Sequence, residues 1–382
     1  MVGSRACITL CDSMFALAIP WIVLSATGSV LWTGTVASVA LVALLAGSLV
    51  SPWLVRRLGP EPVIQISFAA NMAGMALIGY CVAVQGLPVA LLILAIVIER
   101  ITDLTGNVAI ESRFPELARH GGVPLPKLNA IKESLMTGAM IVGPALAGVM
   151  LAVFDPVVTV VVATAFYAAG IAFFQPVRAV YRRGPGASAS APSIFGTLSW
   201  LWQRRHLRSF IILLVLVMAS ISSIDDVILP ALIDATTQNP ADIGWVLATY
   251  GIAAVISAMA YARFHDRVPD ALVTRIGIAG VALFFAGLAM PISVGPFLAV
   301  TFVAGLLSGA LGPIIDTRFL TDTPASRRLP MLAALGVLAI GAAPLMVVLH
   351  AAMIDRFGVE PLAAAIAGLL LLSLLLPLDR RA

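Results

Sequence analysis

The sequence predicts an all-α polytopic membrane protein in which twelve transmembrane helices form two six-helix repeats. The chain is 60% hydrophobic and only 11% charged, whereas soluble domains carry about 25% charged residues. Its apolar runs reach the length of about 20 residues that a membrane-spanning helix needs. They lack the alternation of transmembrane strands, which favours helices over a barrel. The distribution of basic residues and a repeat between the two halves complete the prediction.

Each of the twelve apolar stretches is expected to satisfy its backbone groups as one helix. The first half, residues 1–176, holds six of them, and the second half, residues 209–382, holds the other six. The expected spans are residues 6–27, 32–53, 62–84, 88–112, 129–153, 157–176, 209–232, 241–262, 271–292, 295–317, 331–353 and 360–378.

Positive charges orient these spans in the membrane. Of the 23 Lys and Arg residues, all except Arg100 and Arg356 fall in every second gap between spans, within about a turn of such a gap, or at the chain ends. Cytoplasmic loops carry an excess of Lys and Arg, so the pattern places both termini in the cytoplasm and the protein in the inner (plasma) membrane. The net charge of +4 is thereby explained without nucleic acid. A soluble enzyme is excluded.

The two halves are joined by a cytoplasmic linker at residues 177–208. Its stretch Gly184–Pro192 contains only small residues and proline, a composition typical of a flexible tether. Ser193 can cap a short helix with Ile194 and Trp202 on one face, which would lie at the membrane surface. The alternative is a simple lead-in to the seventh span.

Short segments recur at equivalent span positions in both halves, at a nearly constant spacing. Ala18-Ile19-Pro20 recurs as Ile228-Leu229-Pro230, Glu111-Ser112-Arg113-Phe114 as Asp316-Thr317-Arg318-Phe319, and Pro144 as Pro344. Parallel six-helix repeats with substrate bound between them are a transporter architecture.

Over its whole length the chain resembles the major facilitator superfamily, and its first span resembles the branch of siderophore and drug exporters. The superfamily loop between spans two and three reads G-x-L-x-D-R-x-G-R-[RK], and Arg57 and Gly59 match it, while Arg56 replaces the aspartate. This resemblance implies a conformation-dependent charge lock. The second-half copy keeps acid and base as Asp266 and Arg267, so we expect the lock there.

The fifth span resembles the antiporter motif of the superfamily, G-x3-G-P-x2-G-G. Gly143, Pro144 and Gly148 match it, with Ala147 in place of one glycine. Small residues permit close helix approach, and a proline lets the helix bend. The resemblance implies export, whereas the alternative is ordinary helix packing.

Ionisable residues inside spans are candidates for functional sites. Span four carries Glu99, Arg100 and Asp103, and its two carboxylates, four residues apart, share a helix face. We expect Asp12 of span one to join them as a site that binds and releases protons. The resemblance implies that Arg100 assists proton transfer or holds a carboxylate; the alternative is a structural ion pair.

Candidate substrate contacts are Asn107, one turn beyond Asp103, and Asp225 or Asp226 in span seven. Adjacent helical residues point about 100° apart, so one aspartate is expected to face the cavity. A cavity acid favours a cationic substrate or carries a proton. The alternative is a position near the outer interface, where we also expect His350 as a solvated histidine.

Acid–base pairs also recur at the inner helix ends, where they would form a cytoplasmic gate: Glu111, Arg113, Asp316 and Arg318. Cys7 and Cys11 lack a third soft ligand, so we expect packing residues and no metal. The chain has no glycine-rich phosphate loop or catalytic motif. No cofactor is expected.

These observations predict a secondary active transporter that exports a small amphipathic organic molecule by alternating access, driven by protons. The expected partners are that substrate, protons and the lipid bilayer, with the protein as a monomer. Uptake by proton symport on the same fold remains an alternative. A second alternative is a receptor or scaffold that does not transport, although three charges retained in span four argue against it.

Overall fold

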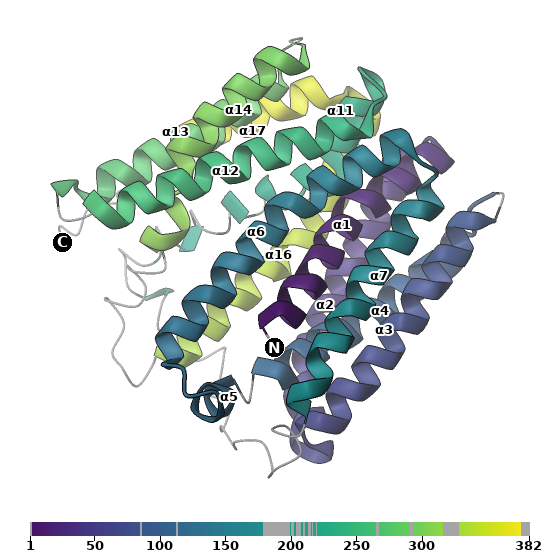
Figure 1. Ribbon diagram of the computed structural model, residues 1–382. Helices are drawn as coiled ribbons and strands as arrows, with labels where there is room; N and C mark the ends of the chain where they lie inside the picture. Colours follow the sequence, from purple (N-terminus) through teal and green to yellow (C-terminus); the bar gives the residue numbers. More distant parts are fainter. Residues whose placement is uncertain are drawn as a thin grey trace. The chain divides into compact units, whose positions relative to one another are not determined.

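The computed structural model describes residues 2–84, 86–111, 114–178, 220–264, 267–290, 293–315 and 328–375, with isolated positions between 199 and 218. Every regular element in these ranges is a helix (Figure 1). Among the described helices, eight are long and apolar enough to cross a membrane. The predicted all-helical class is confirmed.

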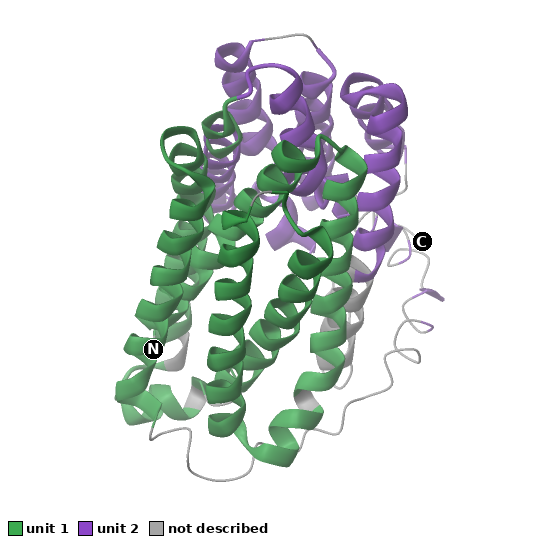
Figure 2. Ribbon diagram, turned by 90° about the vertical axis from the view of Figure 1, so that its right-hand side faces the viewer, with its two compact units in different colours: residues 1–189, 239–244 green, residues 190–238, 245–382 purple. Residues whose placement is uncertain are grey.

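The chain divides into two compact units (Figure 2). Unit 1 comprises residues 1–189 and 239–244, and unit 2 comprises residues 190–238 and 245–382.

Unit 1 contains six long helices, and α4 packs between α2 and α3 while α1 packs against α6 and α7. Their bounds lie close to the first six predicted spans. A short helix in the second inward gap, α5 (Phe114–His120), was not predicted. The long helices are α1 (Val2–Thr27), α2 (Val30–Leu58), α3 (Pro60–Ala83), α4 (Val89–Glu111), α6 (Leu125–Val153) and α7 (Pro156–Phe174).

Local sequence explains where these helices begin and end. Ser29 accepts a hydrogen bond from the Trp32 amide at the start of α2, and Asp155 accepts one from the Val157 amide at the start of α7, as capping residues do. Gly59 joins α2 to α3 without an intervening loop. Its φ of 84° lies in the left-handed region, which glycine enters without steric cost.

The first element of unit 2 with described bounds is a π-helical turn, η2 (Ile224–Ile228), which leads into α11 (Leu229–Ala235). The predicted span 209–232 is therefore irregular at Asp225 and ends later than expected. Half of residues 209–220 lie outside the described residues. In η2 the amides of Val227 and Ile228 both donate to the Ser223 carbonyl, which accommodates the extra residue of a π-turn.

The remaining helices of unit 2 follow the predicted spans, and α13 packs against α14 and α17. α16 contacts η2. These helices are α12 (Pro240–Phe264, whose first residues belong to unit 1), α13 (Asp270–Leu288), α14 (Val294–Ser308), α16 (Arg328–Phe357) and α17 (Val359–Ser373).

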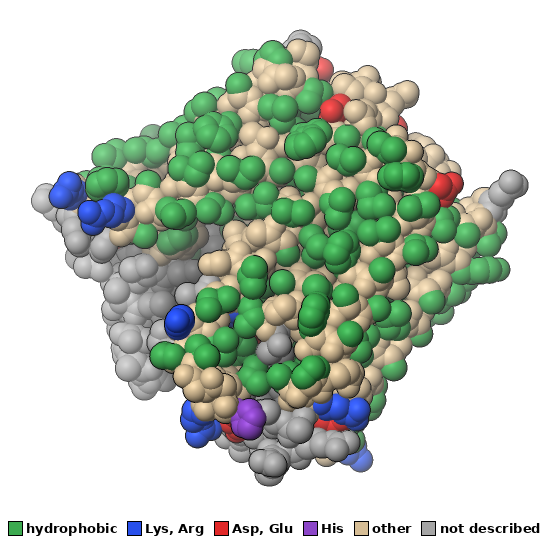
Figure 3. Space-filling view, in the orientation of Figure 1, with side chains coloured by type: hydrophobic (Ala, Val, Ile, Leu, Met, Phe, Trp, Pro, Cys, Tyr) green, Lys and Arg blue, Asp and Glu red, His purple; other side chains and the backbone are tan. Residues whose placement is uncertain are grey.

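Hydrophobic side chains cover most of the face drawn in Figure 3, and Lys and Arg side chains appear at its margins. Leu49, Val153 and Met259 are about two-thirds exposed or more. Large apolar side chains exposed in such numbers suit lipid rather than water. α4 differs because Glu99, Arg100 and Asp103 interrupt its apolar run, and the two carboxylates are buried within unit 1.

Candidate functional site

Two carboxylates lie in the interior of unit 1 on one face of α4. Glu99 is 3% exposed and Asp103 is 8% exposed. Close contacts hold α3 against this face, since a Cβ on Gly74 would lie 3.3 Å from the Ala95 carbonyl oxygen and from the Glu99 Cβ. Burying two acids costs considerable free energy unless they are paired or protonated, so their partners determine what the site can do.

Glu99 is only half satisfied. Its Oε2 lies 3.2 Å from Nε of Arg100, while its Oε1 is buried without a hydrogen-bond partner among the described residues. The structure therefore contains the ion pair considered for Arg100. The second oxygen of Glu99 remains a position where a proton or a ligand donor can bind.

Asp12 on α1 faces the same interior. It lies within electrostatic reach of Glu99 and Asp103, and of Arg100 and Arg5. Its Oδ1 is buried without a partner in the described residues. The structure thus brings together the acids that the sequence placed in spans one and four.

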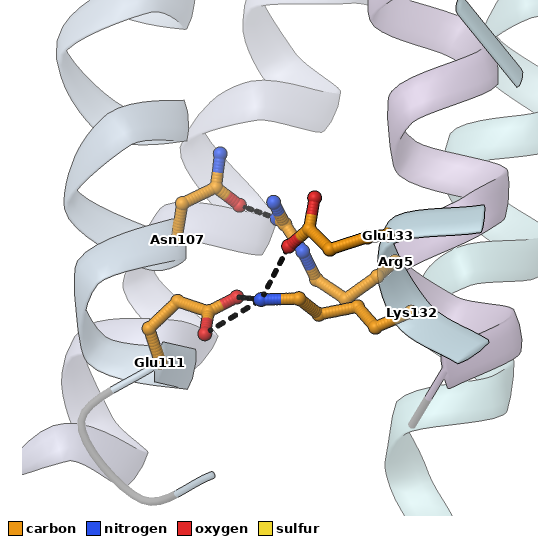
Figure 4. Close-up of polar contacts among 5 residues, drawn as sticks. All are labelled: Arg5, Asn107, Glu111, Lys132 and Glu133. Atoms are coloured by element: carbon orange, nitrogen blue, oxygen red, sulfur yellow. Dashed lines mark hydrogen bonds and ion pairs between the residues drawn. The ribbon is translucent and has the colours of Figure 1, made fainter. Parts of the chain in front are cut away.

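Arg5 also belongs to this cluster, although the sequence suggested only a cytoplasmic flanking residue. It is 6% exposed, and its guanidinium donates to Oδ1 of Asn107 (Figure 4). Nδ2 of Asn107 in turn donates to Oδ2 of Asp103 at 2.9 Å. A signal was present in the sequence: Arg5 and Asp12 are seven residues apart, which places them on one helix face.

An ion pair lies at the end of α4, one turn beyond Asn107. Nζ of Lys132 on α6 is 3.0 Å from Oε1 of Glu111 and 3.3 Å from Oε1 of Glu133 (Figure 4). Glu111 thus forms a salt bridge at the end of α4, with Lys132 as a partner that sequence reasoning missed. Arg113, its predicted neighbour in the gate, lies outside the described residues.

Unit 2 contains a second polar cluster around η2. The Asp225 side chain is exposed and Asp226 is partly buried, so the two adjacent aspartates do occupy different environments. Tyr250 on α12 is within electrostatic reach of Asp225, and its hydroxyl lies 2.7 Å from Oγ of Ser308 on α14.

The prediction of a solvated His350 is wrong. His350 on α16 is 3% exposed, and its Nδ1 lies 2.7 Å from Oγ of Ser223. Ser223 is the residue immediately before η2, and α16 packs against that turn, which removes the imidazole from solvent. The position of His350 within its apolar segment could not reveal this contact, because the two residues are 127 positions apart in the sequence.

No family model matches the chain. The multidrug efflux pump Tap of Mycolicibacterium fortuitum is 26% identical over 355 residues, which cover 90% of this chain and 86% of the pump. The Tap pump of Mycobacterium tuberculosis strain H37Rv is 27% identical over 372 residues, with 93% and 86% covered.

Solved transporters share the fold. The nucleoside transporter NupG superposes with a TM-score of 0.78 at 13% identity, over 98% of this chain and 96% of NupG. A bacterial homologue of the iron transporter ferroportin, in an inward-facing state, gives 0.73 at 14% identity over 98% and 96%. The chain resembles the drug exporters of the major facilitator superfamily. It is a multi-pass membrane transporter and not an enzyme.

The superfamily loop motif lies between α2 and α3. Arg57 is exposed, with its guanidinium carbon 5.3 Å from the centre of the Trp53 ring, and Gly59 forms the junction already described. Arg267 of the second copy lies 5.9 Å from the Phe264 ring centre. Asp266 lies outside the described residues, as do Asp316, Arg318 and most of the 177–208 linker with its expected interfacial helix.

The antiporter-like motif lies on α6 beside the buried cluster. Gly143 is buried against α1, where a Cβ would come within 3.2 Å of the Leu10 carbonyl oxygen and collide with Cβ of Ser13. Pro144 lies inside the helix, and Gly148 is buried one turn further on. The motif therefore brings α6 close to α1 next to Asp12.

The cysteines of the described part of the chain are free thiols. Cys11 is fully buried and Cys7 is partly exposed. No group of three or more His, Cys, Asp and Glu side chains that could hold a metal ion occurs among the described residues.

Proposed function

We propose that this transporter is a proton-coupled exporter of small amphipathic organic molecules, working by alternating access in the inner membrane. The half-satisfied Glu99 carries the proposal. A buried carboxylate with one oxygen on Arg100 and the other without a described partner can alternate between ionised and protonated forms at modest cost. Asp12, Glu99, Arg100 and Asp103 form the proposed proton site.

The efflux direction is supported by the Tap pumps, which match the chain over nine-tenths of its length. The Gly143-Pro144 segment, which permits close packing of α6 on α1, agrees with the antiporter-like motif. We assign export to this chain on these two grounds together.

We infer twelve spans in two repeats of six. Among the described helices, eight meet the length and hydropathy of a span. The other four spans would be the charged helix α4, α16, α17 and the segment 209–232. With that number both termini lie on the same side, and the positive loops place that side in the cytoplasm. A monomer is sufficient for this architecture.

The substrate contacts are proposed for unit 2. Asp225 is exposed on the π-turn with Tyr250 within electrostatic reach, so a cationic amphipathic molecule would find both charge and an aromatic ring. Asp226 is the second candidate. Asn107 belongs with the proton site instead, because both ends of its amide already bind protein groups.

The test is substrate-triggered proton release from the purified protein in detergent, across a panel of cationic drugs and siderophores. An antiporter releases protons when substrate binds. Glu99→Gln combined with Asp103→Asn should abolish release while substrate still binds. Release that persists in this double variant would remove the proton role from span four.

Vesicle flux then decides the direction. Antiport and symport move protons in opposite directions relative to substrate, so an imposed pH gradient drives accumulation in only one orientation. If substrate enters together with protons, the protein is a symporter for uptake on the same fold, and the proposal of export is wrong. Absence of flux for every ligand that binds would favour a receptor.

A further inference from the structure

Arg5 is a basic residue near the start of α1 that the structure buries inside unit 1. It lies in the first turns of α1 with only 6% of its surface exposed. A buried guanidinium is costly unless an anion or acceptors compensate it. Its position therefore demands a partner inside unit 1.

Asn107 forms a hydrogen bond with Arg5, and Asp103 supplies the negative charge nearby. The guanidinium donates to the amide oxygen of Asn107 (Figure 4). The amide nitrogen of Asn107 donates to Asp103 at 2.9 Å. A side-chain amide can accept one hydrogen bond and donate another at the same time. Asn107 can therefore link a cation and a carboxylate that do not contact each other. Arg5 and Asp103 also interact electrostatically.

We propose that Arg5 and Asn107 form a charge bridge that stabilises the ionised form of Asp103 and weakens when Asp103 takes up a proton. This inference rests on the proposed proton coupling. Proton uptake converts the carboxylate to the neutral acid, and the attraction between Arg5 and Asp103 is then lost. The cytoplasmic end of α1 would accordingly be tied to α4 in the deprotonated state and released in the protonated state.

Other groups share the field around Asp103. They come from three helices: Cys11 and Asp12 on α1, Glu99 and Arg100 on α4, and Tyr167 on α7. Near the end of the cluster, Lys132 on α6 is already paired with Glu111. The helices α2 and α3 carry charged residues only at their ends. Arg5 and Arg100 are therefore the two cations that favour the ionised acid, and Arg100 is bound to Glu99.

The first test is the pH midpoint of substrate-triggered proton release in the full-length protein. Arg5→Gln should move the midpoint to higher pH by about one unit. A nearby positive charge favours the ionised form of a carboxyl group, and its removal changes the proton affinity by about this amount. Arg5→Lys keeps the positive charge, so its midpoint should stay close to that of the unmodified protein. Asn107→Leu should give a shift to higher pH that is smaller than the shift of Arg5→Gln. Arg119→Gln removes an equivalent charge from an exposed position near the end of α5 and should leave the midpoint unchanged.

The second test needs no transport. Thermal unfolding at pH 8 is compared for Arg5→Gln, Asp103→Asn and the double variant. If the residues act through one bridge, each single variant melts about 3 °C lower and the double variant melts no lower than the worse single one. If Arg5→Gln does not fold, Asn107→Leu takes its place in the cycle.

The outcomes separate the two proposals. Additive melting shifts, or an unchanged midpoint in folded Arg5→Gln, would overturn the bridge whatever the protein transports. A non-additive cycle in a protein that never releases protons would support the bridge and refute proton coupling.

Discussion

At the scale of single residues, partners decide what each buried group can do. Glu99 and Arg100 are adjacent in sequence and pair with each other, while Glu99 Oε1 and Asp12 Oδ1 have no described partner. Glu99 combines one paired oxygen with a buried side chain, an arrangement that suits a group that exchanges protons.

The contact between His350 and Ser223 permits a prediction at this scale. Ser223→Ala removes the hydroxyl that contacts the buried imidazole, so unfolding should become easier by about 1–2 kcal/mol. Thermal unfolding in detergent measures the change. Ser48→Ala, which loses only a bond within its own helix, is the matched control; an equal loss in both variants would show that the imidazole contact contributes nothing.

At the scale of elements, small residues set the distances between helices. Gly74 and Gly106 let α3 approach α4, and Gly143 lets α6 approach α1. The contacts place side chains of α1 and α4 in one interior. This close packing keeps the carboxylates away from lipid, where charged groups are costly.

Gly143 gives the prediction for α6. Gly143→Leu should force α6 away from α1, and overpacking of this kind costs about 1–3 kcal/mol, so transport should be lost or strongly reduced. Gly138→Leu lies on the same helix with open space around its Cα and should retain transport. The measurement is flux in vesicles at matched expression; equal flux in both variants would contradict the packing role.

At the scale of the whole molecule, topology is the proposal most open to direct measurement. Leu87→Cys, between α3 and α4, should react with a membrane-impermeant maleimide applied to intact spheroplasts. His120→Cys, at the end of α5, should react only after the membrane is opened. Reversed labelling would show that the orientation inferred from the positive loops is wrong. The native Cys11 and Cys81 are buried and should contribute little background labelling.

The sequence by itself determined the helical class, the approximate bounds of most spans and the acids of spans one and four. These follow from hydropathy and from spacing along one helix, which are local properties. Only the tertiary structure showed that Arg5 is buried beside Asn107, that Lys132 pairs with Glu111, and that His350 contacts Ser223. It also revealed the π-turn at Asp225. Such contacts join residues far apart in the chain, and a long side chain near a helix end can point to water or inward equally well until its neighbours are in place.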